Sequence, residues 1–230
     1  MNWNRFALRL CVASGIGLFG TVSQAAIVET DAISHTGFAV LSTDLINGLT
    51  PTSISGTTDQ EGLLSNTAGT ALTNGLFGPP ALVEGGPNPD LTIINNGASI
   101  TYSLLAPATI MEIDTFTGWR DAGRSQQSYI ILVSSNGTDF APLFTVASQF
   151  DTSGTNPSDE RVAITNTGNT PLATNVEAIR FDFPTTQNGY VGYREIDVLG
   201  SSSATPEPGS MALLSFGALA LLARRLRSGS

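Results

Sequence analysis

The sequence predicts an all-β domain of the β-sandwich or jelly-roll type. Between residues 90 and 200, several short runs alternate β-branched, aromatic or aliphatic residues with polar ones, which is typical of half-buried strands. Turn-forming pairs such as Asn96-Gly97, Asn136-Gly137 and Asn188-Gly189 separate these runs. The same part contains no amphipathic helical stretch of three turns, so many short strands must build the core.

Each predicted strand has its own pattern. Residues 99–105 alternate around Ile100, Tyr102 and Leu104, and residues 127–134 (QSYIILVS) consist almost entirely of strand-forming residues. The earlier part, roughly 36–90, is rich in Gly, Thr, Asn and Pro, and we expect long loops there with one or two strands. The last predicted strand, 191–199, alternates Arg194, Ile196 and Val198 with Tyr193, Glu195 and Asp197. The predicted strands are 99–105, 108–117, 127–134, 140–147, 179–183 and 191–199.

Residues 1–25 have the pattern of a secretory signal peptide, which we expect to form a signal helix. Arg5 and Arg9 precede an apolar run, and Ser23 and Ala25 place small residues before a cleavage site for signal peptidase. The alternative is a permanent N-terminal membrane helix, which the short apolar run disfavours. Because Cys11 would leave with the signal, we expect the mature chain to contain no thiol and no disulfide.

Residues 206–230 form a second special segment, after a short Ser/Thr-rich linker at 201–205. An apolar stretch at 211–223 is followed by arginines, the arrangement of a stop-transfer helix whose basic end stays in the cytoplasm. The stretch is shorter than the roughly 20 residues that span a bilayer comfortably, which favours a transient transmembrane anchor. The motif residues are Pro206, Glu207, Pro208, Arg224, Arg225 and Arg227.

This tail closely resembles the PEP-CTERM sorting signal of Gram-negative bacteria, in which the triplet, the apolar helix and the basic cluster occur in this order. The resemblance covers about 25 residues. It implies recognition by an exosortase, removal of the tail near Pro206 and transient anchoring in the inner membrane. The resemblance also implies delivery to the cell surface or the extracellular polysaccharide matrix.

Composition excludes several classes of function. The chain has no lysine, one histidine and one cysteine, so lysine-dependent chemistry and a zinc site of the usual nitrogen and sulfur ligands are excluded. Residues 26–205 contain 18 acidic residues and five arginines, a formal charge of −13, which argues against nucleic acid as a partner. Binding to an anionic polysaccharide by charge alone is also disfavoured unless divalent cations bridge the two.

Residues 115–146 and 179–200 carry a second resemblance. A strand that ends in Ser134 before the Asn136-Gly137 turn, and a closing strand YREIDVLG at 193–200, are similar to the discoidin or coagulation-factor type C domain. That family belongs to the galactose-binding-like jelly rolls. The resemblance assigns residues 26–200 to one such domain and implies a noncatalytic module that binds glycans, lipids or cell surfaces.

The same resemblance implies one structural Ca²⁺. Its ligands would include Glu195 of the closing strand and Asn74 in the Asn74-Gly75 loop, with Asp44 and Asp59 as further candidates. Hard carboxylate and carbonyl oxygens are the ligands that Ca²⁺ prefers. The alternative is that Glu195 is a solvated strand residue opposite Asp197.

A ligand site is expected around Trp119, Arg120, Arg124 and Tyr190. An aromatic face can stack on a sugar ring, and arginines beside a carboxylate make directional hydrogen bonds to hydroxyl groups. The alternative is structural: the indole fills the end of the sandwich, and the arginines form internal ion pairs. Candidate partners for such pairs are Asp114, Asp121 and Asp182.

Three functions therefore compete. The leading one is an exported carbohydrate-binding module associated with extracellular polysaccharide, and the second is a structural matrix or surface protein without a ligand site. The third, a small secreted glycoside hydrolase, is disfavoured, and we expect no enzyme. Asp159 and Glu160 are adjacent, so on a strand they point to opposite faces. Glu112 and Asp114 share a face, where we expect them to be solvated.

Overall fold

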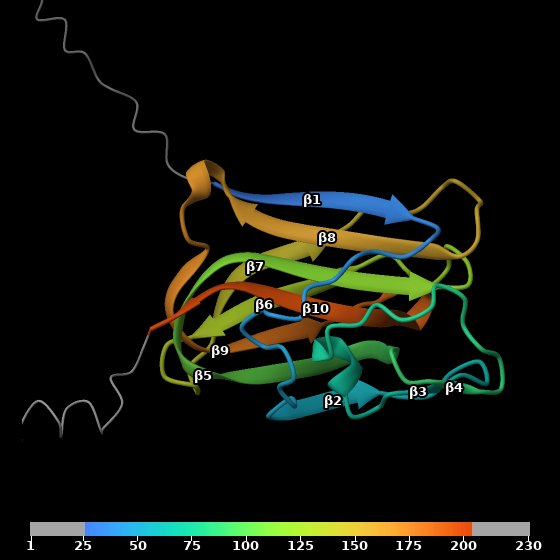
Figure 1. Cartoon of the computed structure of the whole chain (residues 1–230), viewed down its shortest axis with the longest axis horizontal. Coiled ribbons are helices and arrows are strands. Elements are labelled where there is room, and N and C mark those ends of the chain that lie inside the picture. Colours follow the sequence, from blue (N-terminus) through green and yellow to red (C-terminus); the bar gives the residue numbers. More distant parts are fainter. Residues whose placement is uncertain (1–25, 204–230) are drawn as a thin grey trace, which may run out of the picture.

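The longest strand, β5 (Thr92–Trp119), connects the two layers of the computed structural model, which describes residues 26–203 (Figure 1). The expected signal segment 1–25 and sorting segment 206–230 lie outside the described residues. Within residues 26–203, no helix has the length and apolar character needed to cross a membrane. The other elements are β1 (Ile27–Ser34), β2 (Ser53–Thr57), β3 (Leu64–Ser65), η1 (Thr70–Thr73), β4 (Pro87–Asn88), β6 (Ser128–Ser134), β7 (Ala141–Ala147), β8 (Ser158–Asn166), η2 (Thr167–Asn169), β9 (Ala173–Phe183), η3 (Gln187–Gly189) and β10 (Tyr190–Ser202).

β5 reaches both layers because it changes partners along its length. Its first half pairs with β2 and, through Ala98–Ser103, with β9, and β6 and β7 continue that layer beyond β9. Its second half, Glu112–Trp119, pairs with β8, and β1 lies beyond β8. β10 pairs with both parts of β5. The main strands thus form one hydrogen-bonded path, β1-β8-β5-β9-β6-β7, that folds over on itself.

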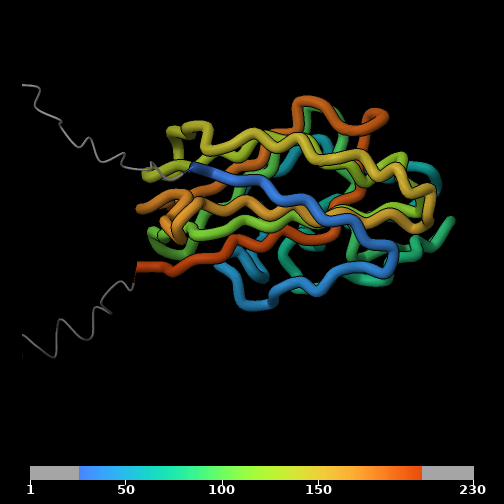
Figure 2. Tube along the Cα trace, turned by 90° about the horizontal axis from the view of Figure 1, so that it is seen from above, coloured from blue at the N-terminus to red at the C-terminus, as the bar shows by residue number. Residues whose placement is uncertain are grey.

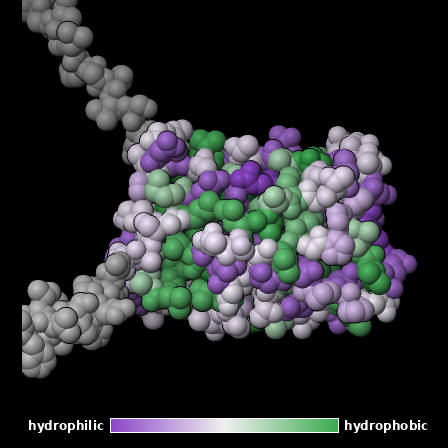
Figure 3. Space-filling view, in the orientation of Figure 1, coloured by the Kyte–Doolittle hydropathy of each residue, from purple (hydrophilic) through white to green (hydrophobic). Residues whose placement is uncertain are grey.

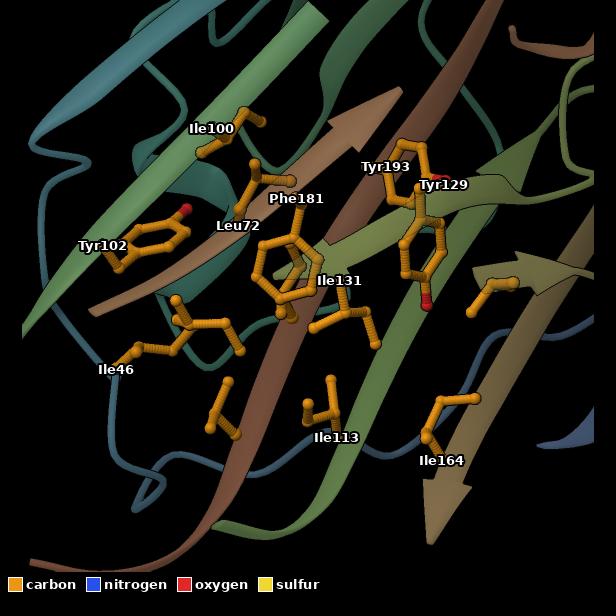
Figure 4. Close-up of a cluster of buried hydrophobic side chains, with 14 of the residues drawn as sticks. Ile46, Leu72, Ile100, Tyr102, Ile113, Tyr129, Ile131, Ile164, Phe181 and Tyr193 are labelled. Atoms are coloured by element: carbon orange, nitrogen blue, oxygen red, sulfur yellow. The ribbon is translucent and has the colours of Figure 1, made fainter. Parts of the chain in front are cut away.

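The hydrophobic core lies between these layers (Figure 4). Ile113 of β5 and Ile164 of β8 come from one side, and Ile131 of β6 and Phe181 of β9 come from the other. Tyr129 packs edge-to-face against Phe181, with ring centroids 5.9 Å apart. The all-β sandwich predicted from alternating patterns is therefore confirmed, because alternate residues of these strands meet in one core.

The predicted strands correspond to β5, β6, β7, β9 and β10, with four differences. β5 begins at Thr92, before the predicted 99, and β9 begins at Ala173, before the predicted 179. The runs at 99–105 and 108–117 belong to the single strand β5. β10 continues past Gly200 to Ser202, and the Ser203 amide donates to the Pro107 carbonyl at 2.8 Å, so pairing extends into the segment expected to be linker. Residues 36–90 are mostly loops, as expected, with the short elements β2, β3, β4 and η1.

Two strands, β1 and β8, were not predicted. β8 is buried on both faces and carries Asp159 and Glu160 at fully buried positions, so its sequence has the polar character of a loop. β1 is an edge strand with its pattern inverted: Glu29 and Asp31 are partly buried, while Val28 and Ile33 are more exposed. Both strands carry acidic residues on the inner face, so neither shows the alternation of apolar and polar residues from which strands are predicted.

The alternation predicted for the last strand is wrong at one point. Tyr193 pairs with Thr117, and the next paired residue of β10 is Glu195, opposite Phe116, so Arg194 is an extra residue of the β-bulge type. Tyr193 therefore shares the core with Ile196 and Val198, which we had placed on the other face. Beyond the bulge, Glu195 and Asp197 point away from the core.

The segment between β1 and β5, residues 35–91, covers this outer side of β10, and we call it the covering segment. Its Leu41 amide donates to Asp197 at 2.9 Å and its Gly75 amide donates to Glu195 at 3.1 Å, while the buried side chains of Ile46 and Leu72 belong to the hydrophobic core. Glu195 and Asp197 are consequently buried as well. On the face shown in Figure 3, apolar and polar residues are mixed. Several of the molecule's exposed apolar side chains belong to the covering segment: Leu41, Leu64, Leu76 and Val83.

The start of the first strand and the end of the last strand lie at the same end of the sandwich (Figure 2). β1 begins there, and β10 ends there at Ser202. Tyr190, at the start of the 13-residue β10, lies at the opposite end, roughly 40 Å away for an extended strand. The described chain therefore begins and ends at one end of the sandwich, and the loops around Tyr190 lie at the other.

Candidate functional site

A charged and aromatic cluster lies at the end of the sandwich that contains Tyr190. Arg120 follows β5, Arg124 belongs to the next loop, and Glu61 and Glu84 come from the covering segment. We call these five residues the surface cluster. The Arg124 guanidinium carbon lies 4.0 Å from the centroid of the Tyr190 ring, a cation–π contact, and Arg124 Nη2 lies 3.5 Å from Glu61 Oε1.

The surface cluster is linked by further ion pairs and hydrogen bonds. The two terminal nitrogens of Arg120 pair with different carboxylates, those of Glu61 and Glu84, and the Tyr190 hydroxyl donates to Glu61. The hydrogen bond from Tyr190 and the pairing with Arg120 lower the pKa of Glu61 below its ordinary value. Glu61 is therefore a carboxylate at neutral pH, held between a phenol and two guanidinium groups.

Trp119 does not reach the exposed part of this site, and its burial favours the structural alternative, in which the indole fills the end of the sandwich. The indole is 1% exposed and packs with Leu63, Leu91 and Ile93. It contacts Tyr190 edge-to-face, with centroids 5.9 Å apart. It fits because residue 192 is glycine: a Cβ there would lie 2.6 Å from the indole ring. The half-buried Tyr190 is the aromatic residue that reaches the surface.

The arginines have partners other than those we expected. Arg120 and Arg124 pair with glutamates of the covering segment. Of the predicted aspartates, Asp114 binds Arg161 at 2.6 Å and Asp182 binds Arg180 at 3.1 Å, while the Asp121 carboxylate accepts the Gly123 amide at 2.7 Å. Sequence reasoning missed Glu61 and Glu84 because a long loop without periodicity contains no signal for where its residues fold.

Glu195 is the centre of a second candidate site. Its side chain is 0% exposed. The alternative that Glu195 is a solvated strand residue is therefore wrong. Its Oε1 accepts the Gly75 amide at 3.1 Å, and its Oε2 is buried without a partner. Burial, together with the negative charges of Asp197 and Asp44, raises the pKa of Glu195 to about 9. The structure therefore brings Glu195 to the Asn74-Gly75 loop, as the resemblance implies.

Its acidic neighbours are held by backbone amides. Asp44 Oδ1 accepts the amides of Ile46 at 2.8 Å and Val198 at 3.2 Å, and Asp197 Oδ2 accepts the Leu41 amide at 2.9 Å. Each of the two carboxylates keeps one buried oxygen without a partner. Burial raises the pKa of Asp197 to about 7, and the nearby charges of Asp44 and Asp114 add to that effect.

The other implied ligands fit less directly. Asn74 Oδ1 accepts the Leu76 amide at 2.8 Å, and its Nδ2 donates to Asp90 at 3.2 Å. Asp59 accepts hydrogen bonds from Ser65, at 2.7 Å from its amide. Across residues 26–203, no group of three His, Cys, Asp or Glu side chains is already arranged to hold a metal. A cation at Glu195 would thus depend on its free Oε2, on neutral oxygens of the loop and on the unpartnered oxygens of the neighbouring Asp44 and Asp197.

The acids considered for hydrolysis are engaged structurally. Asp114 is 5% exposed and bound to Arg161, which also contacts Glu112 at 3.2 Å, so the expectation that Glu112 and Asp114 are simply solvated is wrong for Asp114. Asp159 accepts the Gly37 amide at 2.9 Å, whereas Glu160 accepts the Gln127 amide at 3.1 Å. Asp159 and Glu160 thus bind different parts of the chain, as expected for adjacent strand residues.

The fold and these sites define a two-layered β-sandwich with a polar, tyrosine-containing surface cluster at one end. Residues 204–228 match the PEP-CTERM protein-sorting motif, which confirms the prediction made from the triplet, the apolar run and the arginines. The motif marks the chain for export and for sorting through the membrane. No curated protein matches the chain.

Solved structures similar to this chain include carbohydrate-binding modules. The family 32 carbohydrate-binding module from Streptococcus pneumoniae EndoD is 12% identical, with a TM-score of 0.49, and the match covers 69% of this chain and 100% of that one. A family 32 module (CBM32-3) from a family 31 glycoside hydrolase of Clostridium perfringens is 12% identical, with a TM-score of 0.46 and coverage of 67% and 92%. The lectin-binding domain of lectinolysin, solved with Lewis b, is 12% identical, with a TM-score of 0.45 and coverage of 71% and 99%.

Proposed function

We propose that this exported protein is a noncatalytic carbohydrate-binding module whose ligand contacts the surface cluster. The observation that carries the proposal is the convergence of two arginines, two glutamates and a tyrosine from three distant parts of the chain on one exposed spot. Guanidinium groups and carboxylates supply directional donors and acceptors for sugar hydroxyls, and the Tyr190 ring supplies an apolar surface.

The position of the cluster supports the same function. The chain leaves the sandwich toward the sorting motif after Ser203, at the end opposite Tyr190. While the tail anchors the protein, the surface cluster would face away from the membrane, toward extracellular polysaccharide. Exosortase and signal peptidase are the partners that the two linear signals imply during export.

A glycan array with the full-length chain in mild detergent tests this proposal. Arg120→Ala and Arg124→Ala should each weaken binding to the selected glycan by about tenfold or more, the loss expected for a central interface arginine. Arg180→Ala is a matched control, because the Arg180 side chain is 32% exposed, as Arg120 is, and also pairs with an acid. Equal losses in all three variants, or binding unchanged by the first two, would contradict the assignment.

A structural matrix protein is the second candidate, and one observation favours it. Arg120 pairs with Glu61 and Glu84 within the chain, and Trp119 is buried, so these charges are compensated without a ligand. An array on which no glycan binds, together with destabilisation in Arg120→Ala, would support this role.

We also propose that Glu195 and Asn74 hold one structural Ca²⁺, which would neutralise the buried carboxylate and connect the covering segment to β10. The unpartnered Oε2 of Glu195 supports this assignment. Chelation by EDTA should lower the melting temperature of the full-length chain, and the decrease should be smaller in Glu195→Gln. Glu177→Gln, on β9, is the control. Identical melting temperatures with and without chelator would remove Ca²⁺ from this site.

A further inference from the structure

A groove of about 480 Å³ lies on the outer face of β5, β8 and β10. Its floor side chains alternate along β5 with core residues such as Ile113, so they point away from the core. Its wall is the start of the covering segment. Among the lining residues are Phe38 and Leu41 of the wall and Glu112, Asp114, Phe116 and Arg161 of the floor. We call this the sheet-face groove.

The wall of the groove is attached to its floor. The Leu41 amide donates to Asp197 of β10 at 2.9 Å. The Phe38 ring packs against Phe116, with centroids 5.9 Å apart, and edge-to-face against Phe77, at 6.0 Å. Phe38 is half-buried and Leu41 is 43% exposed, so both leave apolar surface open to a ligand. The groove is therefore preformed, with an apolar wall beside a polar floor.

The floor has more hydrogen-bond acceptors than donors. Arg161 Nη2 lies 2.6 Å from Asp114 Oδ2 and 3.2 Å from Glu112 Oε1, so its charge is shared between two carboxylates. Asp197 adds a third carboxylate to the lining. Asp114 is 5% exposed, and its Oδ1 is buried without a hydrogen-bond partner. Such an oxygen is costly to leave unpaired, so the floor offers an acceptor to a donor group of a ligand.

The charges of the sheet-face groove favour a positively charged ligand. Its carboxylates outnumber its single guanidinium, so they repel an anion. A protonated amine supplies the N–H donors that Asp114 Oδ1 lacks and the positive charge that the floor lacks. An amine of this kind is also attracted to the face of an aromatic ring such as that of Phe38. The chain has no lysine, so a lysine of a neighbouring copy cannot supply this group.

We propose that the sheet-face groove binds an amino sugar, with its ammonium group at Asp114 and its ring against the apolar wall. The volume of the groove is within the range of small-molecule sites. The hydroxyl groups of such a ligand can donate to Glu112 and accept from Arg161. Asp197 lies seven residues after Tyr190 in β10, roughly 20 Å along an extended strand. This site is therefore separate from the surface cluster and does not depend on ligand binding there.

Isothermal titration calorimetry of the full-length chain in mild detergent tests this inference. The probes are the disaccharide of glucosamine and that of N-acetylglucosamine, which has the same sugar rings without the charge. The glucosamine disaccharide should bind about tenfold more tightly or better, because only it carries ammonium groups. Leu41→Arg places a positive charge at the exposed wall and should weaken its binding by about tenfold or more. Glu112→Gln removes one negative charge and should weaken it severalfold.

Two control variants locate the binding. Asp139→Asn removes a charge from an exposed turn outside the groove, and Arg120→Ala changes the surface cluster, so both should retain the affinity for the glucosamine disaccharide. A loss in Asp139→Asn as large as in Glu112→Gln would show general attraction to an acidic surface and overturn the proposal. Equal affinity for the two disaccharides, no binding of either, or binding lost in Arg120→Ala but kept in Leu41→Arg would also overturn it. If Leu41→Arg does not fold, Glu112→Gln at its partly exposed position gives the same comparison.

Discussion

Replacing Trp119 with alanine tests whether the indole serves the core or a ligand. The side chain is 1% exposed and packs against Leu63, Leu91, Ile93 and Tyr190. An indole of this kind buries about 150–250 Å², which at about 25 cal/mol/Å² corresponds to roughly 4–6 kcal/mol as an upper bound. Large-to-small changes in cores cost about 3–5 kcal/mol in measured series. We therefore expect Trp119→Ala to lower the free energy of unfolding by about 3–5 kcal/mol.

Urea unfolding followed by circular dichroism measures this loss without relying on tryptophan fluorescence. For a domain of this size, the same loss lowers the melting temperature by roughly 6–20 °C. Trp119→Phe is the matched variant: it keeps an aromatic ring in the cluster and should lose about half as much. If Trp119→Ala lowers the free energy of unfolding by less than about 1 kcal/mol, with an unchanged dependence of that free energy on urea concentration, the structural role is refuted. The indole would then again be a candidate for ligand binding.

Two further predictions concern stability. Gly192→Ala should destabilise the fold by about 1–3 kcal/mol, because its Cβ would lie 2.6 Å from the Trp119 ring and 3.0 Å from the Gly118 carbonyl; urea unfolding measures it, and an unchanged midpoint would show that the indole can move aside. Burial raises the pKa of Asp159 to about 6, above its unfolded value of about 3.8, so the folded state keeps a proton that the unfolded state has lost. Its contribution to stability is therefore fully present below about pH 4 and declines as the pH rises to about 6, by at most about 3 kcal/mol. Asp159→Asn should flatten this part of the stability profile relative to the wild type, and identical profiles would contradict the assignment.

Local patterns predicted five of the ten strands, β5, β6, β7, β9 and β10. β6 and β10 were found from alternation or from strand-forming composition within a few residues, because a strand with one buried face repeats every two residues. β8 escaped because Asp159 and Glu160 occupy buried positions, and β1 escaped because its inner face carries Glu29 and Asp31. In both strands, the acids take their hydrogen bonds from backbone amides that only the folded chain brings to them.

The candidate site was predicted only in part. Arg120, Arg124 and Tyr190 do converge, but the buried Trp119 and the partners Glu61 and Glu84 were not foreseen. Glu195 does meet the Asn74-Gly75 loop, with the Gly75 amide at 3.1 Å. Because of the bulge at Arg194, Glu195 and Asp197 face the covering segment although Tyr193 faces the core. One extra residue in a strand is enough to move all later side chains to the opposite face.

The amino-acid sequence by itself determined the sorting tail and the β character of the domain. A sorting signal is recognised as a linear segment, and alternation depends on near neighbours, so both are visible without a fold. Only the tertiary structure decided which charges meet. Arg120 and Glu61 are 59 residues apart, and Gly75 and Glu195 are 120 apart. Such contacts depend on how the layers close over one another, which no short window of sequence contains.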